Sequence, residues 1–176
     1  CENPTNADLV ALMCVLDGAD AGLTTASGMA AVFTIMAGLL NRGYHGVAAR
    51  AIFSATNQIL NTILPRWGIS SSYFDGRNPD TWEAAFTGQT RICIVESPSN
   101  PGLSLVDIER LAALFRERDV LLVVDNNFAT PIVQQPLSLG ANFVLHSTTK
   151  FLDGQGRTEG GVIVSEQQIV EELIAF

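Results

Sequence analysis

The sequence predicts an α/β fold built on a mostly parallel sheet with helices on both faces. Apolar runs of strand length alternate along the chain with segments whose apolar residues have helical spacing. The predicted strands are continuously apolar, as in residues 120–124, which is typical of strands that are covered on both faces. Alternation and continuous apolar runs together favour parallel strands joined by helical crossovers.

Each predicted helix carries apolar residues at helical spacing. In the first one, Leu9, Leu12, Met13 and Leu16 share a face, and Gly18 is a typical residue for ending a helix. The predicted helices cover residues 5–17, 28–40, 54–67, 81–86 and 106–118, and a last helix starts from the N-cap candidate Ser165.

The predicted strands are short apolar segments bounded by glycine, proline or polar residues. Two of them end their apolar run on a carboxylate, at Glu96 and at Asp125. The predicted strands cover residues 23–26, 46–49, 69–74, 91–96, 120–125, 143–146 and 161–164.

Composition limits the classes of function. The chain has 176 residues, of which 47% are hydrophobic and 16% charged, so we expect a packed core rather than disorder. A net charge of −8 disfavours nucleic acid and anionic membrane surfaces as partners, and no apolar run reaches membrane-spanning length. Cys1, Cys14 and Cys93 show no disulfide spacing, which favours a reduced, cytoplasmic protein.

The residues at both ends indicate that the sequence is a piece of a longer protein. The chain opens at Cys1 in a loop-like segment and stops at Phe176 within a helical pattern. We expect residues 1–176 to form one large domain that is incomplete at both ends.

Polar residues gather where four predicted strands end. In parallel sheets, ligands bind beyond the carboxyl ends of the strands. These positions hold residues 27–29, 96–100, 125–126 and 147–150. Together they supply hydroxyls, an amide, two carboxylates and a lysine.

Lys150 is the sole lysine, since the other nine basic residues are arginine. Only an amine can lose its proton and attack a carbonyl, although a surviving surface lysine is the plain alternative. Ser147, Thr148 and Thr149 precede it directly, and such hydroxyls suit a phosphorylated cofactor that bonds to the lysine. A strand-to-helix turn at residues 27–29 adds backbone N–H groups, which suit phosphate.

Asp125 ends the most apolar strand, where an unpaired carboxylate is costly. A helix cap or a surface acid is an equally common role for such a residue. A pyridinium nitrogen beside the carboxylate offsets the cost, and pyridoxal phosphate sites use such a pair. Phosphate donors, an acid and a lysine amine therefore predict a pyridoxal phosphate site.

Other motifs indicate less specific roles. The glycines between Gly154 and Gly161 miss the dinucleotide fingerprint by one residue, and no predicted strand directly precedes them, which argues against a nicotinamide-dependent enzyme. We expect Cys14 and Cys93 to be core thiols and His146 to be a packed or hydrogen-bonded residue. No residue spacing predicts a metal site.

Longer motifs resemble the pyridoxal phosphate enzymes of cysteine and methionine metabolism, which include cystathionine synthases and lyases, methionine lyase and homoserine-ester sulfhydrylases. The resemblance implies the large cofactor domain of fold-type I pyridoxal phosphate enzymes. Segments 53–57 and 153–157 are most similar to O-succinylhomoserine sulfhydrylases. The segments that carry the family resemblance, in chain order, are residues 26–31, 95–101, 123–131, 135–137, 139–141 and 146–152.

The resemblance assigns roles to the residues around the cofactor ring. Lys150 matches the lysine that forms a Schiff base with the cofactor and carries protons. Asp125 matches the partner of the ring nitrogen, and Asn100 matches the amide near the phenolic oxygen. Phe53 stands where many relatives stack a tyrosine on the ring.

The resemblance also assigns the phosphate site. Gly28 and Met29 match its backbone donors, and Ser147 and Thr149 match its hydroxyl donors. Glu159 departs from the family pattern, which has an apolar residue there.

The resemblance implies γ-replacement on an O-acylated homoserine, with O-succinylhomoserine as the expected ester, by sulfide to give homocysteine. Cystathionine γ-synthase and methionine or cystathionine γ-lyase are alternatives, and a non-catalytic remnant of the fold is an alternative of another class. Phe53 lacks the phenol of tyrosine, which weakens a lyase assignment. Ser54 stands where the family has a glycine.

The implied partners are a small amino-acid substrate and further copies of the chain, as a homotetramer. In the family a tyrosine and an arginine just before the Asn3–Pro4 position reach the phosphate of a neighbouring subunit. The arginine that binds the substrate carboxylate belongs to a C-terminal domain. We therefore expect residues 1–176 alone to be inactive and to hold pyridoxal phosphate weakly.

Overall fold

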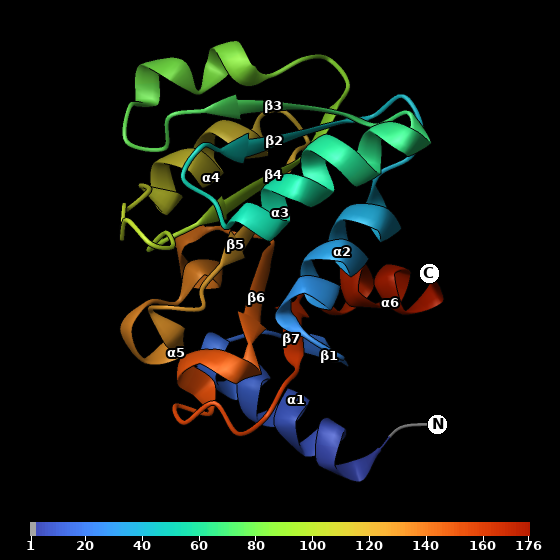
Figure 1. Ribbon diagram of the computed structural model, residues 1–176, viewed down its shortest axis with the longest axis vertical. Coiled ribbons are helices and arrows are strands. Elements are labelled where there is room, and N and C mark those ends of the chain that lie inside the picture. The colour runs from blue at the N-terminus through green and yellow to red at the C-terminus, as the bar shows by residue number, and fades with distance from the viewer. Residues whose placement is uncertain (1–2) are drawn as a thin grey trace.

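The computed structural model describes residues 3–176, so Cys1 lies outside the described residues. The strands are β1 (Ala21–Thr25), β2 (His45–Ala49), β3 (Ser70–Phe74), β4 (Thr90–Glu96), β5 (Leu121–Asp125), β6 (Phe143–Ser147) and β7 (Gly161–Ser165). They form one seven-stranded sheet in the order β1-β7-β6-β5-β4-β2-β3 (Figure 1). The predicted α/β fold is confirmed.

The sheet is parallel from β6 to β3 and antiparallel at its other edge. β7 runs antiparallel to both β6 and β1. The loop between β6 and β7 contains Gly154 and Gly156 at φ values of 68° and 66°, a backbone conformation that favours glycine and supports a reversal of direction. Because the apolar pattern of residues 161–164 is equally compatible with either direction, it did not indicate this reversal.

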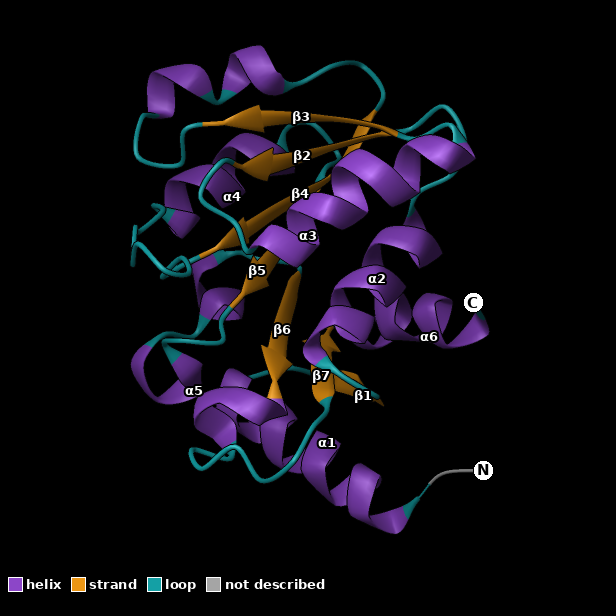
Figure 2. Cartoon of the chain, viewed as in Figure 1, coloured by secondary structure: helices purple, strands orange, loops and turns teal. Residues whose placement is uncertain are grey.

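Helices cover both faces of the sheet (Figure 2). The helices are α1 (Pro4–Asp17), α2 (Gly28–Leu39), α3 (Ser54–Gln58), α4 (Ile108–Arg116), α5 (Thr130–Val133) and α6 (Gln167–Ala175). α2, α3 and α6 pack on one face, whereas α1 and α4 pack on the other.

Three predicted helices differ from the structure. The segment 54–67 divides into α3, a π-helical turn at Ile59–Ile63 and a 3-10 turn at Leu64–Trp67. Pro65 lies in the last turn and has no N–H to continue a regular helix. The expected N-cap Ser165 instead belongs to β7, where its hydroxyl donates to the Asn142 carbonyl, and Glu166 precedes α6.

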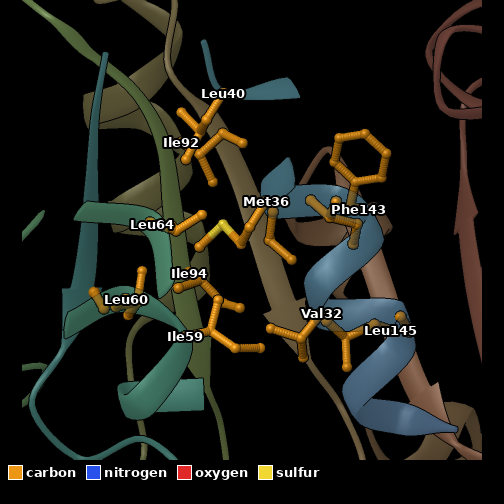
Figure 3. Packing of buried hydrophobic residues seen from close by; sticks show 14 of the residues in the cluster. Val32, Met36, Leu40, Ile59, Leu60, Leu64, Ile92, Ile94, Phe143 and Leu145 are labelled. Atoms are coloured by element: carbon orange, nitrogen blue, oxygen red, sulfur yellow. The ribbon is translucent and has the colours of Figure 1, made fainter. Parts of the chain in front are cut away.

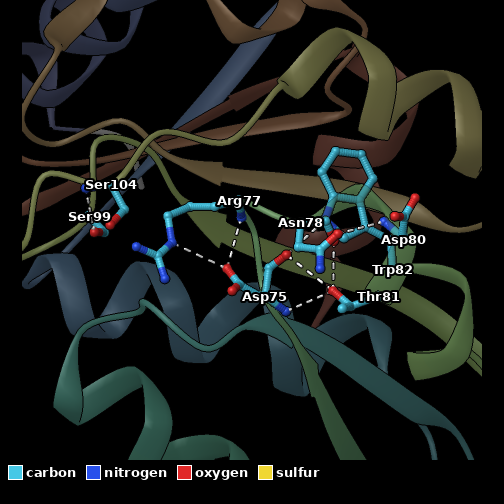
Figure 4. A network of polar contacts seen from close by, with 8 residues as sticks. All are labelled: Asp75, Arg77, Asn78, Asp80, Thr81, Trp82, Ser99 and Ser104. Atoms are coloured by element: carbon cyan, nitrogen blue, oxygen red, sulfur yellow. Dashed lines mark hydrogen bonds and ion pairs between the residues drawn. The ribbon is translucent and has the colours of Figure 1, made fainter.

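The predicted helix 81–86 is replaced by two 3-10 turns, Pro79–Thr81 and Glu83–Ala85. A local polar network holds this segment (Figure 4). The indole N–H of Trp82 donates to the Asp75 carbonyl at 3.0 Å, and the Thr81 hydroxyl accepts the Asp75 N–H at 3.1 Å. These side-chain bonds compete with the backbone bonds of a regular helix.

The largest core lies between α2 and the centre of the sheet (Figure 3). Val32 and Met36 of α2 pack there against Ile94 of β4 and Leu145 of β6, and all four side chains are buried. This packing fixes the start of α2 above the carboxyl ends of β4, β5 and β6, where the candidate site lies.

No helix within residues 3–176 is long and apolar enough to cross a membrane.

Candidate active site

A cavity of about 300 Å³ lies at the carboxyl ends of β4, β5 and β6, beside the start of α2. That volume is at the lower end of the range for small-molecule sites. The sequence-predicted site residues all line this cavity: Gly28, Met29, Phe53, Asn100, Asp125, Ser147, Thr149 and Lys150. The fold therefore brings together eight residues that are spread over most of the sequence.

Strand register places two carboxylates side by side in the cavity. Glu96 ends β4 and Asp125 ends β5, and the two residues are direct partners in the parallel pairing. Side chains alternate along a strand, so Glu96 shares the α2 face with Ile94, and Asp125 shares it with Val123. Ser147 follows at the end of β6, on that same face as Leu145.

Asp125 is buried, with 5% of its surface exposed. Its Oδ1 accepts one hydrogen bond, from the Asn127 N–H at 3.2 Å. Burial and, to a smaller extent, the charge of Glu96 together raise the pKa of Asp125 to about 8, against the opposing effect of the Asn127 N–H. This carboxyl group is thus arranged to hold a proton near neutral pH unless a cationic partner takes its place.

Glu96 is also buried, with 2% of its surface exposed. Burial raises its pKa, and the backbone N–H groups of Asn100 and Phe53 act as hydrogen-bond donors that oppose this rise. Its Oε2 atom has no hydrogen-bond partner in the described part of the chain. An acceptor of this kind is costly to bury, which marks it as a functional candidate.

The start of α2 presents backbone donors to the cavity. Ser27 is the N-cap: its hydroxyl accepts the Ala30 N–H at 3.1 Å, and its carbonyl accepts the Ala31 N–H at 3.0 Å. The N–H groups of Gly28 and Met29 therefore remain for an external acceptor, at the positive end of the helix dipole. Together they form an anion site.

Gly28 is required by the close approach of α2 to β6. A Cβ atom at this position would lie 2.6 Å from the Cβ of Ser147, a distance that side chains do not tolerate. Glycine thus allows the first turn of α2 to face the Ser147 hydroxyl across the cavity.

Lys150 follows β6 in a tight, irregular turn. The turn spans Thr148–Leu152, and Lys150 has non-helical angles, φ −90° and ψ −128°. The Ser147 N–H donates to the Asn127 side chain, and the Thr148 N–H donates to the Gly160 carbonyl at 3.0 Å. These bonds hold the segment that carries the lysine and the hydroxyls of the cavity.

The Asn100 loop and Phe53 form the remaining walls. Ser99 and Ser104 close the loop: the Ser104 N–H donates to the Ser99 hydroxyl, and the Ser99 N–H donates to the Ser104 carbonyl, both at 3.0 Å (Figure 4). Phe53 directly precedes α3 and has 37% of its surface exposed, so its ring is accessible to a planar ligand.

Several residues that line the cavity received no predicted role, among them Glu96, Asn127 and Phe128. Glu96 was located at a strand end but received no role, and Asn127 and Phe128 were not singled out. For Asn127 a signal existed, since it lies two residues beyond Asp125, where an Asx-type contact to the backbone is common.

The residues expected to have structural roles lie away from the cavity. Cys93 is buried in β4 and Cys14 is half-buried in α1, and both are free thiols. His146 is hydrogen-bonded to Asp17. Among residues 3–176, no three His, Cys, Asp or Glu side chains lie close enough together to hold a metal ion.

The donor set of the cavity fits pyridoxal phosphate. Free N–H groups and hydroxyls at one end match a phosphate, and the buried Asp125 with its single hydrogen bond matches a protonated ring nitrogen. A sequence model described as "Cys/Met metabolism PLP-dependent enzyme" matches residues 1–176. The chain belongs to this family. The predicted family membership is confirmed, and the family depends on pyridoxal phosphate.

Family members with different reactions are similar to this chain. An O-succinylhomoserine sulfhydrylase from Pseudomonas aeruginosa is 40% identical over 99% of this chain and 43% of its own length. A cystathionine gamma-lyase from Bacillus subtilis is 39% identical over 99% of this chain and 46% of its own length. The chain thus spans less than half the length of these curated relatives.

A solved family structure shows the same fold with the cofactor bound. A Campylobacter jejuni protein that carries N′-pyridoxyl-lysine-5′-monophosphate matches with a TM-score of 0.91 and 29% identity, over 97% of this chain and 42% of its own. In that structure a lysine carries the covalent link to the cofactor.

Proposed function

We propose that the chain carries the cofactor site of an enzyme that replaces the acyloxy group of an O-acylated homoserine with sulfide, giving homocysteine. O-Succinylhomoserine is the proposed ester. In this reaction the Cγ–O bond breaks, the carboxylic acid leaves, and a Cγ–S bond forms. The observation that carries the proposal is the gathering of all eight predicted residues around one cavity.

The two ionisable residues at the ring have distinct proposed roles. The Lys150 amine binds the cofactor covalently and then moves protons at the α and β carbons of the substrate. Asp125 accepts the N–H of the ring nitrogen and keeps that nitrogen protonated. When bound, pyridoxal phosphate supplies an electron sink for negative charge on the substrate carbons.

The phosphate is the proposed anchor of the cofactor. The N–H groups of Gly28 and Met29 and the hydroxyls of Ser147 and Thr149 surround the anion site at the start of α2. Charge-assisted hydrogen bonds of this type are about twice as strong as neutral ones.

Two residues hold the ring itself. The Phe53 ring stacks on one face of the cofactor, and the Asn100 amide faces its phenolic oxygen. Both residues line the cavity, Phe53 from the loop before α3 and Asn100 from the loop after β4.

The choice of γ-replacement over γ-elimination rests on Phe53. A phenylalanine keeps the stacking of an aromatic ring but has no phenol for proton transfer, which disfavours a lyase. Sulfhydrylases and lyases are similar to the chain at 40% and 39% identity, so identity alone does not choose between them.

We further propose a cytoplasmic homotetramer in which a neighbouring subunit completes the phosphate site. Residues 1–176 form its pyridoxal-phosphate-binding domain. The free thiols of Cys14 and Cys93 and the net charge of −8 support a reduced compartment and a small-molecule substrate.

The test uses the full-length gene product with pyridoxal phosphate, O-succinylhomoserine and sulfide. Homocysteine should form only when sulfide is present. The same protein should release little 2-oxo acid from cystathionine or methionine. Residues 1–176 alone should be inactive under these conditions.

Two other outcomes would replace this proposal. Efficient release of a 2-oxo acid from cystathionine or methionine, without homocysteine from the ester, would indicate a γ-lyase. A protein that fails to develop the absorbance of a lysine-linked cofactor would indicate the non-catalytic alternative.

A further inference from the structure

We propose that Glu96 is a positioning residue for the cofactor ring: together with Asp125, its buried carboxylate keeps the proton on the ring nitrogen. The inference rests on the proposed pyridoxal phosphate site. It adds a second carboxylate to a function that Asp125 was expected to perform alone.

The geometry places Glu96 beside Asp125. The two residues are register partners at the ends of adjacent parallel strands, on the face of the sheet that α2 covers. Both line the same cavity, and both are at least nine-tenths buried, with 2% and 5% of their surfaces exposed. A ring nitrogen that contacts Asp125 therefore has the Glu96 carboxylate in its second layer of neighbours.

Glu96 and Asp17 each have a buried carboxylate oxygen without a hydrogen-bond partner among the described residues, but of these two acids only Glu96 lines the cavity. A buried carboxylate that serves only to hold loops is normally satisfied at both oxygens. Burial raises the pKa of Glu96, the backbone N–H groups of Asn100 and Phe53 oppose this rise, and Oε2 has no hydrogen-bond partner among residues 3–176. When it is ionised, Glu96 thus places a negative charge beside Asp125.

This charge acts on any proton near Asp125. Two carboxylates side by side attract a proton more strongly than one, and the effect is large where water is excluded. In the cofactor-free cavity the proton resides on the carboxyl pair, consistent with the raised pKa of Asp125, to which Glu96 contributes. With cofactor bound, the same field favours the protonated ring nitrogen over the neutral one.

The other ionisable groups of the cavity are Lys150 and Glu159, which line it from the segment that connects β6 to β7. Both are exposed, so solvent screens their charges. Cys93 of β4 is buried but packs in the core on the opposite face of the sheet. Among the described residues, Glu96 is therefore the buried charge that faces Asp125.

The test measures the protonation of the ring nitrogen by ¹⁵N NMR of labelled pyridoxal phosphate in the holoenzyme, without substrate. Glu96→Gln removes the charge while keeping an oxygen that can accept the Phe53 and Asn100 N–H groups. We expect the pH at which the nitrogen loses its proton to fall by about one to two units, a proton affinity about 10- to 100-fold weaker. Glu109→Gln, which removes an exposed acid of α4, should leave this pH unchanged.

Two further variants keep the proposal falsifiable. Glu96→Asp retains the charge and should retain the protonated nitrogen, and Glu96→Ala replaces Glu96→Gln if the latter does not fold. The proposal is overturned if the ring nitrogen loses its proton at the same pH in the wild type and in Glu96→Gln or Glu96→Ala. A change in the titration of Asp125 alone would not rescue it. Because no substrate is present, the result does not depend on whether the enzyme catalyses γ-replacement or γ-elimination. Failure of the wild type to bind pyridoxal phosphate would instead refute the proposed function.

Discussion

The imidazole Nε2 of His146 lies 2.9 Å from Oδ2 of Asp17, and this contact joins β6 to the last residue of α1. Both side chains are buried, with exposures of 1% and 0%. His146 directly precedes Ser147 of the candidate site but points to the opposite face of the sheet. The pair therefore fixes α1 against the strand that carries a predicted phosphate ligand.

Breaking this buried pair should be destabilising. Asp17→Ala leaves a buried ring nitrogen of His146 without its hydrogen-bond partner, and we expect the free energy of unfolding to fall by about 1–3 kcal/mol. Urea denaturation measures the change. Glu83→Ala is the matched control, because it breaks the exposed Arg118–Glu83 ion pair, which is worth less than about 1 kcal/mol. Equal effects of the two substitutions would contradict a structural role for the buried pair.

Lys150 should be indispensable for the covalent link. Lys150→Ala removes both nucleophile and proton carrier, so activity of the full-length enzyme should fall by several orders of magnitude. Lys150→Arg should be nearly as damaging, because a guanidinium stays protonated. Borohydride reduction followed by peptide mass analysis should find the cofactor on Lys150 in the wild type. Substantial turnover by Lys150→Ala would refute the assignment.

Asp125 should make the stability of the cofactor-free protein depend on pH. Its pKa is raised from 3.8 to about 8 in the folded state. Between pH 3.8 and about pH 8, Asp125 is protonated in the folded state but ionised in the unfolded state. The free energy of unfolding therefore decreases progressively as the pH rises through this range. The unfolding temperature of the cofactor-free wild type should therefore decrease from about pH 5 to pH 8.

Asp125→Asn tests that dependence. The variant lacks the titrating group, so its unfolding temperature should change less over the same pH range and exceed that of the wild type at the alkaline end. Its catalytic rate should nevertheless fall strongly, since the ring nitrogen loses its anionic partner. An unchanged pH dependence would show that Asp125 titrates normally.

Gly28→Ala should weaken cofactor binding. The added methyl group meets Ser147 at 2.6 Å, so the first turn of α2 must move away from the hydroxyl. Losing one charge-assisted hydrogen bond to the phosphate raises Kd by at least about tenfold. Gly88→Ala is the control, because a Cβ there meets no atom within 4 Å. Quenching of protein fluorescence by pyridoxal phosphate measures both values, and equal affinities would argue against an anion site at α2.

The fold was predictable wherever local patterns decide it. Local sequence patterns located each strand of the sheet, and the Ser27–Gly28 turn located the start of α2 within one residue. The direction of β7 was not predictable, because antiparallel pairing with β6 depends on contacts between segments distant in sequence. Pro65 could have signalled the break in the predicted helix 54–67, but the switch to π-helical bonding at residues 59–63 has no sequence signal that we recognise.

For the site, too, the sequence predicted which residues lie at the strand ends but not the contacts between distant segments. Carboxyl ends of parallel strands meet at one edge, so Asp125 and Ser147 could be placed together from strand positions alone. The pairing of Asp17 with His146 could not, because each residue is unremarkable within its own segment. The unpaired oxygen of Glu96 is likewise a property of the packed structure, since burial alone does not reveal which acceptor lacks a donor.

The sheet order has a consequence for how the chain folds. β1 is an edge strand whose neighbour is β7, so Ala21 near the start of the chain pairs with Ser165 near its end. A ribosome that adds about 5–20 residues per second exposes β1 many seconds before β7 emerges. Closing such a long loop is slow, so β1 and the Ser27 turn beside it should acquire protection from hydrogen exchange last. The parallel strands β2 to β6 can form first. The Ser27 turn, which carries the anion site of the cavity, is then the final part of the domain to assemble.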